Sequence, residues 1–132
     1  MPLTAFDHVN IRTANLDAMV AWYDDILGIA KGARPNFPVP GAWLYLGDRA
    51  VIHLIEADPA PMIHQEGENL RMEHVAFRAT GMAGFTERLD QRGIAYKLVP
   101  FDEIDTVLVF LRDPDGNRIH VDFPLSEMPT DT

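Results

Sequence analysis

The sequence predicts an α+β fold built from two paired βαβββ modules whose strands form a curved mixed sheet. The main observation is an internal repeat, because the second half of the chain echoes the first at offsets of 65 to 67 residues. Asp7-His8-Val9 matches Glu73-His74-Val75, and Ile52-His53-Leu54 matches Ile119-His120-Val121. Two copies of so long a unit indicate a duplicated module rather than a solenoid. Neither module alone could cover its apolar face, so the two are expected to pack together.

The first module, about residues 4–57, begins with a predicted strand over Ala5–Arg12. An amphipathic helix follows: Asn15 is a candidate N-cap, apolar residues recur at three- and four-residue steps, and Gly28 lies just past the last of them. Three prolines make Lys31–Gly41 a loop or an irregular edge. The module is expected to end in a hairpin of two strands, Ala42–Leu46 and Ala50–Ile55.

Residues 58–69 are rich in proline and charge and are expected to link the modules, so that residues 1–132 form one domain. The second module, about residues 70–124, repeats the order of the first. Its predicted elements are a strand over Met72–Arg78, a helix over Met82–Arg92, a strand over Ile94–Val99, an acidic loop over Pro100–Asp105 and a final hairpin of Val107–Leu111 and Arg118–Phe123. Leu125–Thr132 is expected to be a frayed tail.

The final hairpin aims one histidine at a defined face of the sheet. Its turn, Asp113-Pro114-Asp115-Gly116-Asn117, is dense in turn-forming residues. The alternation of a strand then places Arg118, His120 and Asp122 on one face and the apolar residues between them on the other.

Four of the five histidines occupy repeat-equivalent positions: His8 with His74, and His53 with His120. A lone strand histidine is usually an ordinary polar residue, but four related by the repeat would converge on the inside of the sheet. Imidazole suits iron, nickel, cobalt or zinc, whereas magnesium and calcium prefer oxygen ligands. We therefore predict that the four histidines bind one divalent transition metal, and that His64, which has no repeat partner, is a surface residue.

Composition excludes several other classes of protein. The formal charge of −9 argues against a nucleic-acid partner, and no apolar stretch approaches the length of a membrane span. The chain has no cysteine, so thiolate metal sites and disulfides are excluded. A cytoplasmic location is the default expectation. No Gly-rich phosphate loop or basic cluster along the sequence marks a nucleotide or coenzyme A site.

At these positions the sequence resembles the vicinal oxygen chelate superfamily, which includes glyoxalase I, extradiol dioxygenases and bleomycin-resistance proteins. The resemblance covers about residues 4–124 and rests on the segments F-D-H-V-N-I-R, A-W-Y-D-D-I-L-G-I, G-A-W-L-Y-L-G-D-R-A-V-I-H-L, M-E-H-V-A-F-R and F-L-R-D-P-D-G-N-R-I. It implies a small-molecule substrate chelated through neighbouring oxygens, a homodimer, and metal ligands at His8, His53, His74 and His120.

The chain departs from that pattern at two ligand positions. Most metal-dependent members have glutamate where this chain has His120, and glyoxalase I commonly has glutamate at the position of His53. The usual carboxylate base is therefore missing. His120 and Asp122 are the candidate catalytic residues, with Asp122 either reaching the site or orienting His120. Strand parity predicts that Glu56 and Glu73 point away.

The sequence leaves three functions open. The first is a glyoxalase I-like lyase or isomerase, and the second is a non-haem iron dioxygenase of extradiol type. The third is a bleomycin-resistance-like protein that binds a small molecule without catalysis. Trp43 and Tyr45 are candidate pocket residues in each case, although core packing is the more ordinary role of such aromatics.

Overall fold

The computed structural model describes residues 2–57 and 72–129. The chain divides into two compact units, Met1–Ile63 and His64–Thr132, which are called the N-terminal and C-terminal units below. The predicted linker over 58–69, including His64, lies outside the described residues. Within the described ranges, no helix is long and apolar enough to cross a membrane.

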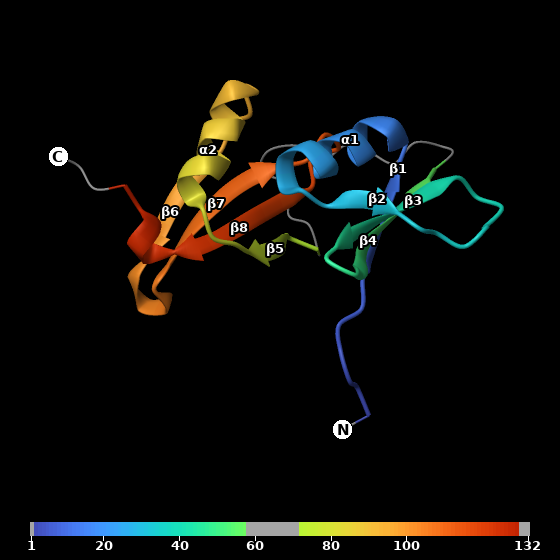
Figure 1. The fold of residues 1–132 in the computed structure, drawn as a ribbon, viewed down its shortest axis with the longest axis horizontal. Coiled ribbons are helices and arrows are strands. Elements are labelled where there is room, and N and C mark those ends of the chain that lie inside the picture. The colour runs from blue at the N-terminus through green and yellow to red at the C-terminus, as the bar shows by residue number, and fades with distance from the viewer. Residues whose placement is uncertain (1, 58–71, 130–132) are drawn as a thin grey trace. The chain divides into compact units, whose positions relative to one another are not determined.

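The N-terminal unit is one mixed four-stranded sheet with a helix (Figure 1). The strand order is β1-β4-β3-β2, with β1 parallel to β4 and the other pairs antiparallel. Its elements are β1 (Val9–Thr13), α1 (Leu16–Leu27), β2 (Ala30–Gly32), β3 (Gly41–Leu46) and β4 (Arg49–Glu56).

The C-terminal unit repeats this arrangement, with strand order β5-β8-β7-β6 and β5 parallel to β8. Its elements are β5 (Val75–Arg78), α2 (Met82–Gln91), β6 (Lys97–Phe101), the 3-10 helix η1 (Asp102–Ile104), β7 (Thr106–Arg112), β8 (Arg118–Pro124) and the 3-10 helix η2 (Leu125–Glu127). The α+β class and the two βαβββ modules are thus confirmed. The curvature of a joint sheet around a metal stays a prediction.

In each unit one face of the sheet is an apolar core. Met19, Tyr23 and Ile26 of α1 are buried together with the alternate strand residues Ala42, Leu44, Ile52 and Leu54. In the C-terminal unit Phe85 of α2 lies 5.5 Å from Phe123, and every second residue of β7 and β8 is buried. Burial of one large aliphatic side chain contributes about 1.5–3 kcal/mol, so this face holds each sheet together. The opposite face carries His53 and His120 together with aromatic residues such as Trp43 and Phe110.

The predicted helices are confirmed, but the strands that precede them begin later than expected. Gly28 ends α1 in the left-handed conformation, with φ 69°, where a β-carbon would be strained. β1 begins at Val9 rather than Ala5, and β5 at Val75 rather than Met72. His8 and His74 therefore lie just before their strands, where period-two alternation no longer fixes the direction of a side chain.

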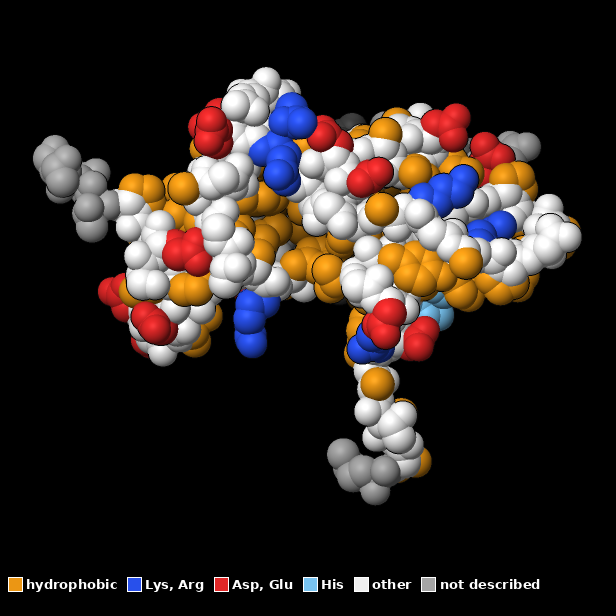
Figure 2. Space-filling view, in the orientation of Figure 1, with side chains coloured by type: hydrophobic (Ala, Val, Ile, Leu, Met, Phe, Trp, Pro, Cys, Tyr) orange, Lys and Arg blue, Asp and Glu red, His pale blue; other side chains and the backbone are white. Residues whose placement is uncertain are grey.

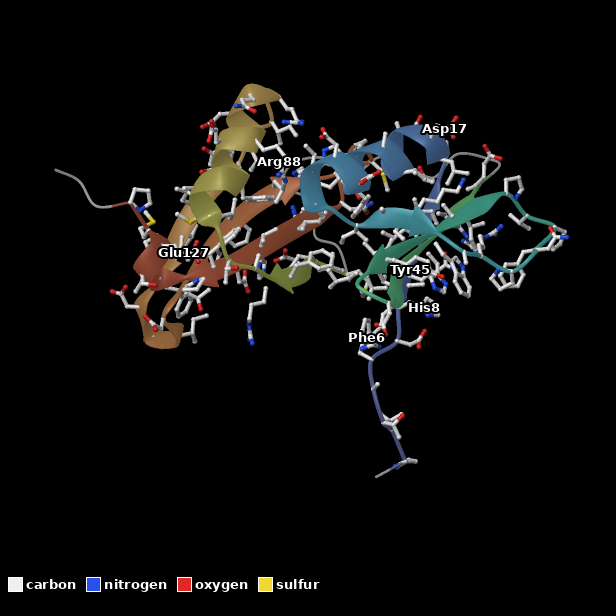
Figure 3. All side chains as sticks on the ribbon, viewed as in Figure 1. Phe6, His8, Asp17, Tyr45, Arg88 and Glu127 are labelled. Carbon is white, nitrogen blue, oxygen red and sulfur yellow. The ribbon has the colours of Figure 1, made fainter. Side chains whose placement is uncertain are left out.

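Two predictions about the C-terminal unit are wrong. The acidic loop predicted over Pro100–Asp105 is not one, because β6, expected over Ile94–Val99, spans Lys97–Phe101 and η1 follows it. The tail is not frayed from Leu125 onward, because η2 is docked on the unit. One oxygen of the Glu127 carboxylate accepts hydrogen bonds from the backbone N–H groups of Gly81 (2.8 Å) and Met82 (2.6 Å), at the start of α2 (Figure 3). It supplies the cap that Gly81 cannot.

Candidate functional site

In the N-terminal unit three aromatic rings form a stack on the face of the sheet opposite the core. His53 of β4 is paired with Trp43 of β3 on one side and with Asn10 of β1 on the other. The His53 ring lies 3.7 Å from the His8 ring and 4.1 Å from the Trp43 ring, centroid to centroid, and both pairs are within 12° of parallel. His8 stands at the foot of β1 (Figure 3), where the exposed N-terminal segment, which Figure 2 shows projecting from the sheet, joins the strand.

The C-terminal unit repeats this cluster with a wider geometry. His120 of β8 is paired with Phe110 of β7 and with Ala76 of β5. The His120 ring lies 4.4 Å from the His74 ring and 5.1 Å from the Phe110 ring of β7, centroid to centroid. Each unit therefore carries two imidazoles in contact, flanked by one aromatic ring.

Three of the four imidazoles are held at Nδ1 by a carboxylate. Asp7 Oδ2 lies 2.6 Å from His8 Nδ1, Glu73 Oε1 lies 3.2 Å from His74 Nδ1, and Asp122 Oδ1 lies 2.5 Å from His120 Nδ1. A carboxylate only accepts hydrogen bonds, so it selects the tautomer with hydrogen on Nδ1. Nε2 then keeps its lone pair, as a metal ligand or a general base requires.

His53 is held differently. Its Nε2 lies 3.2 Å from the carbonyl oxygen of Ala50, which selects the tautomer with hydrogen on Nε2 and leaves the lone pair on Nδ1. Burial lowers the pKa of His53 below 6.5, and the neighbouring His8 lowers it further. The ring is therefore neutral near pH 7, which is the form that binds metals.

The carboxylates show what strand parity can and cannot predict. Asp122 contacts His120, in the orienting position that alternation on β8 allows. The prediction that Glu73 points away is wrong, since Glu73 precedes β5 and reaches its neighbour His74. Asp7 does the same for His8, and this hydrogen bond lowers the pKa of Asp7. Sequence reasoning missed Asp7, although its match with Glu73 in the repeat was a usable signal.

The turn before β8 is rigid enough to fix the direction of that strand. The Asp113 side chain is buried and accepts hydrogen bonds from the backbone N–H groups of Asp115 and Asn117 and from Asn117 Nδ2, at 2.8–3.0 Å. Gly116 has φ 84°, which only glycine adopts readily. His120 follows three residues after Asn117, the last residue of the turn, so its place on the face is set by this turn.

The donor set suits a divalent transition metal, but neither unit completes a site alone. In the two described ranges no three His, Asp or Glu side chains form a group that could hold a metal ion. Each unit supplies two imidazoles with a lone pair, and a stable site needs three or four ligands. The set His8, His53, His74 and His120 joins the two units and therefore stays a prediction.

Comparison with known proteins identifies the family. Residues 5–121 match the model of the Glyoxalase/Bleomycin resistance protein/Dioxygenase superfamily. The chain is 30% identical to "Glyoxylase I 4" of Arabidopsis thaliana over 123 residues, which are 90% of this chain and 70% of that protein. The chain belongs to this superfamily, in which a divalent metal is generally used, small-molecule substrates are bound and dimers are common.

Solved structures agree on the fold. A glyoxylase/bleomycin resistance protein/dioxygenase domain from Frankia sp. EAN1pec has a TM-score of 0.75 at 21% identity, covering 92% of this chain and 98% of that one. A lactoylglutathione lyase from Agrobacterium tumefaciens has a TM-score of 0.64 at 20% identity, covering 93% and 96%. At such identities the likeness concerns the fold, which hosts several chemistries.

Proposed function

We propose that this protein is a metal-dependent enzyme of glyoxalase type, a lyase or isomerase acting on a small substrate that chelates the metal through neighbouring oxygens. One divalent ion of iron, nickel, cobalt or zinc would be held by His8, His53, His74 and His120. The observation that carries the proposal is the hydrogen bonding of the histidines, since each has one ring nitrogen engaged and the other left with its lone pair. The glyoxylase relative supports the reaction class.

The bound metal would polarise the substrate oxygens and make an adjacent C–H more acidic. The residues of the chain would then handle the proton. His120 is the candidate general base once its Nε2 is released from the metal, because the single lone pair of Nε2 can serve either as ligand or as base, and the residue is only 8% exposed. Asp122 is a positioning residue that holds His120 Nδ1 and stabilises the imidazolium formed when His120 takes a proton.

Elemental analysis and a substrate screen test the proposal. The purified protein is loaded with iron, nickel, cobalt or zinc and assayed against α-ketoaldehyde–thiol adducts, catechols and acyl thioesters. We expect one metal per chain and turnover of one of the adducts. His8→Ala, His74→Ala and His120→Ala should each lower the metal content, while His64→Ala, outside the predicted ligand set, should not.

The same experiment can overturn the proposal. If the three variants keep the metal content of the wild type, the histidines are not its ligands. Oxygen uptake with a catechol and the iron-loaded protein would favour the dioxygenase alternative instead. Tight small-molecule binding with no turnover and no metal would favour the bleomycin-resistance-like alternative. We also propose a homodimer, as is common in the family, which sedimentation equilibrium would test.

A further inference from the structure

A pocket of about 650 Å³ lies within the C-terminal unit, next to its histidine pair. This volume is within the usual range for small-molecule sites, roughly 300–1,000 Å³. Phe110 lines the pocket and also contacts the His120 ring, so one side chain is shared by the pocket and the histidine pair. Val99 and Tyr96 add apolar surface to the lining.

Three cationic side chains line the same pocket, one from each of three neighbouring strands. They are Lys97 of β6, Arg112 of β7 and Arg118 of β8. The protein as a whole has 20 acidic and 11 basic residues, so a local excess of positive charge runs against its overall balance. The sequence shows no basic cluster here, because these residues lie up to 21 positions apart and only the strand pairing joins them.

The strand register places the cations beside the histidines. Lys97 is paired with Phe110, and Phe110 with His120, so the three form one row across the sheet. Two residues further along β7, Arg112 is paired with Arg118. Strands are about 4.8 Å apart, so the backbones of Lys97 and His120 are separated by roughly 10 Å. A ligand the size of one aromatic ring with a short side arm spans that distance.

The N-terminal unit shows that the fold itself does not require these charges. At the positions that correspond through the repeat and the strand pairing, it has Gly32 for Lys97, Tyr45 for Arg112 and Val51 for Arg118. Arg112 Nη1 also donates to the carbonyl oxygen of Gly116 at 3.0 Å, so this arginine helps to close the turn. Lys97 is an exposed residue of β6, so the packing of the strand does not require its charge.

An anion bound in the pocket would meet charge-assisted hydrogen bonds from guanidinium and ammonium groups, which come from three adjacent strands. The apolar part of the same ligand would lie on Phe110 and Val99, next to His120.

We propose that this pocket binds the carboxylate or phosphate of a small organic anion whose apolar body lies against Phe110. That this anion is the substrate, with its chelating oxygens directed to the histidines, rests on the proposed function. The anion binding itself does not, and it can be measured on metal-free protein.

The test uses 2-naphthoate, 2-naphthyl phosphate and the uncharged 2-naphthamide as fluorescent probes. Their affinities are measured for metal-free wild type, Lys97→Gln, Arg118→Gln and the control Lys31→Gln, an exposed lysine of β2 in the other unit. We expect at least one anion to bind about tenfold more tightly than the amide, and each pocket variant to lose on the order of fivefold of that affinity. Amide binding should be unchanged throughout, and Lys31→Gln should behave as wild type. Whichever of the two anions shows the larger gain identifies the anionic group.

The inference is overturned if neither anion binds more tightly than the amide, or if Lys97→Gln loses no more anion affinity than Lys31→Gln. If circular dichroism shows that Arg118→Gln is misfolded, the result for Lys97→Gln alone tests the pocket, because Lys97 is exposed and its replacement should leave the fold intact. Nickel affinity measured on the same variants separates the two proposals. Anion binding without any nickel binding would refute the proposed function and support the anion pocket. Unchanged nickel binding without a preference for the anions would support the metal site and refute the anion pocket.

Discussion

Replacement of Asp122 by asparagine tests whether the carboxylates prepare the histidines to bind a metal. Asp122→Asn keeps the shape of the side chain and an oxygen acceptor but removes the negative charge opposite His120 Nδ1. The contact is 2.5 Å long, and the two side chains are 11% and 25% exposed for His120 and Asp122 respectively. Such a partner fixes the ring tautomer and increases the basicity of the other nitrogen.

The structure ranks three such substitutions by distance and exposure. Loss of a hydrogen-bond partner behind a ligating histidine typically weakens metal binding by about 10- to 100-fold, or about 1.4–2.7 kcal/mol. Asp122→Asn is expected in that range because its pair is short and mostly shielded from water. Asp7→Asn should have a smaller effect, since Asp7 is 84% exposed although its contact is 2.6 Å. Glu73→Gln should have the smallest, with 61% exposure and a contact of 3.2 Å.

Competition with a chromophoric chelator, using nickel or zinc at pH 7.5, measures the three affinities. Glu56→Gln at the exposed end of β4 is the matched control. A role of the carboxylates in metal binding is refuted if Asp122→Asn binds the metal as tightly as the control does, and their ranking is refuted if Glu73→Gln is the most damaging of the three. In the first case the carboxylates would be ordinary surface partners of the histidines rather than part of the metal site.

Two further predictions concern stability and pH. Glu127→Ala removes the acceptor at the start of α2 and should lower the free energy of unfolding by about 1–2 kcal/mol, whereas Glu127→Gln should lower it less. Urea unfolding measures both changes. An unchanged urea midpoint for Glu127→Ala would contradict the docking of the tail on α2. The folded state keeps His53 neutral, while the unfolded chain takes up a proton at about pH 6.5, so the stability of metal-free protein should fall as the pH drops below 6.5. The Trp22→Phe variant keeps Trp43, which stacks on His53, as its one tryptophan. The fluorescence of Trp43 should change as His53 of the folded protein takes up a proton, with a midpoint below pH 6.5. A midpoint at or above pH 6.5 would refute the lowered pKa of His53.

The duplicated fold could be predicted because the repeat, the glycines and the alternation of apolar residues act locally. Gly28 is required where α1 ends, and its counterpart Gly93 follows α2 with φ 65°. Strand alternation likewise placed His53 and His120 on the face opposite the core. These features depend on backbone conformation and burial, which a short stretch of sequence largely determines.

Features that join distant residues could not be predicted in the same way. The cap on α2 comes from Glu127, which is 45 residues away from Met82, and no capping motif near the start of α2 indicates it. The cations of the pocket come from three strands whose register is visible only once they pair. Glu73 could not be placed for a different reason: it precedes β5, where strand alternation does not apply.

The hydrogen bonding of the histidines also bears on the missing carboxylate ligands. If four neutral imidazoles bind one divalent cation, no ligand offsets its charge of +2, whereas glutamate ligands would do so. Here the negative charges stand one contact further out, on Asp7, Glu73 and Asp122. They would offset the charge partly while leaving the metal a stronger Lewis acid than with carboxylate ligands. Such a site favours a substrate that itself supplies anionic oxygens.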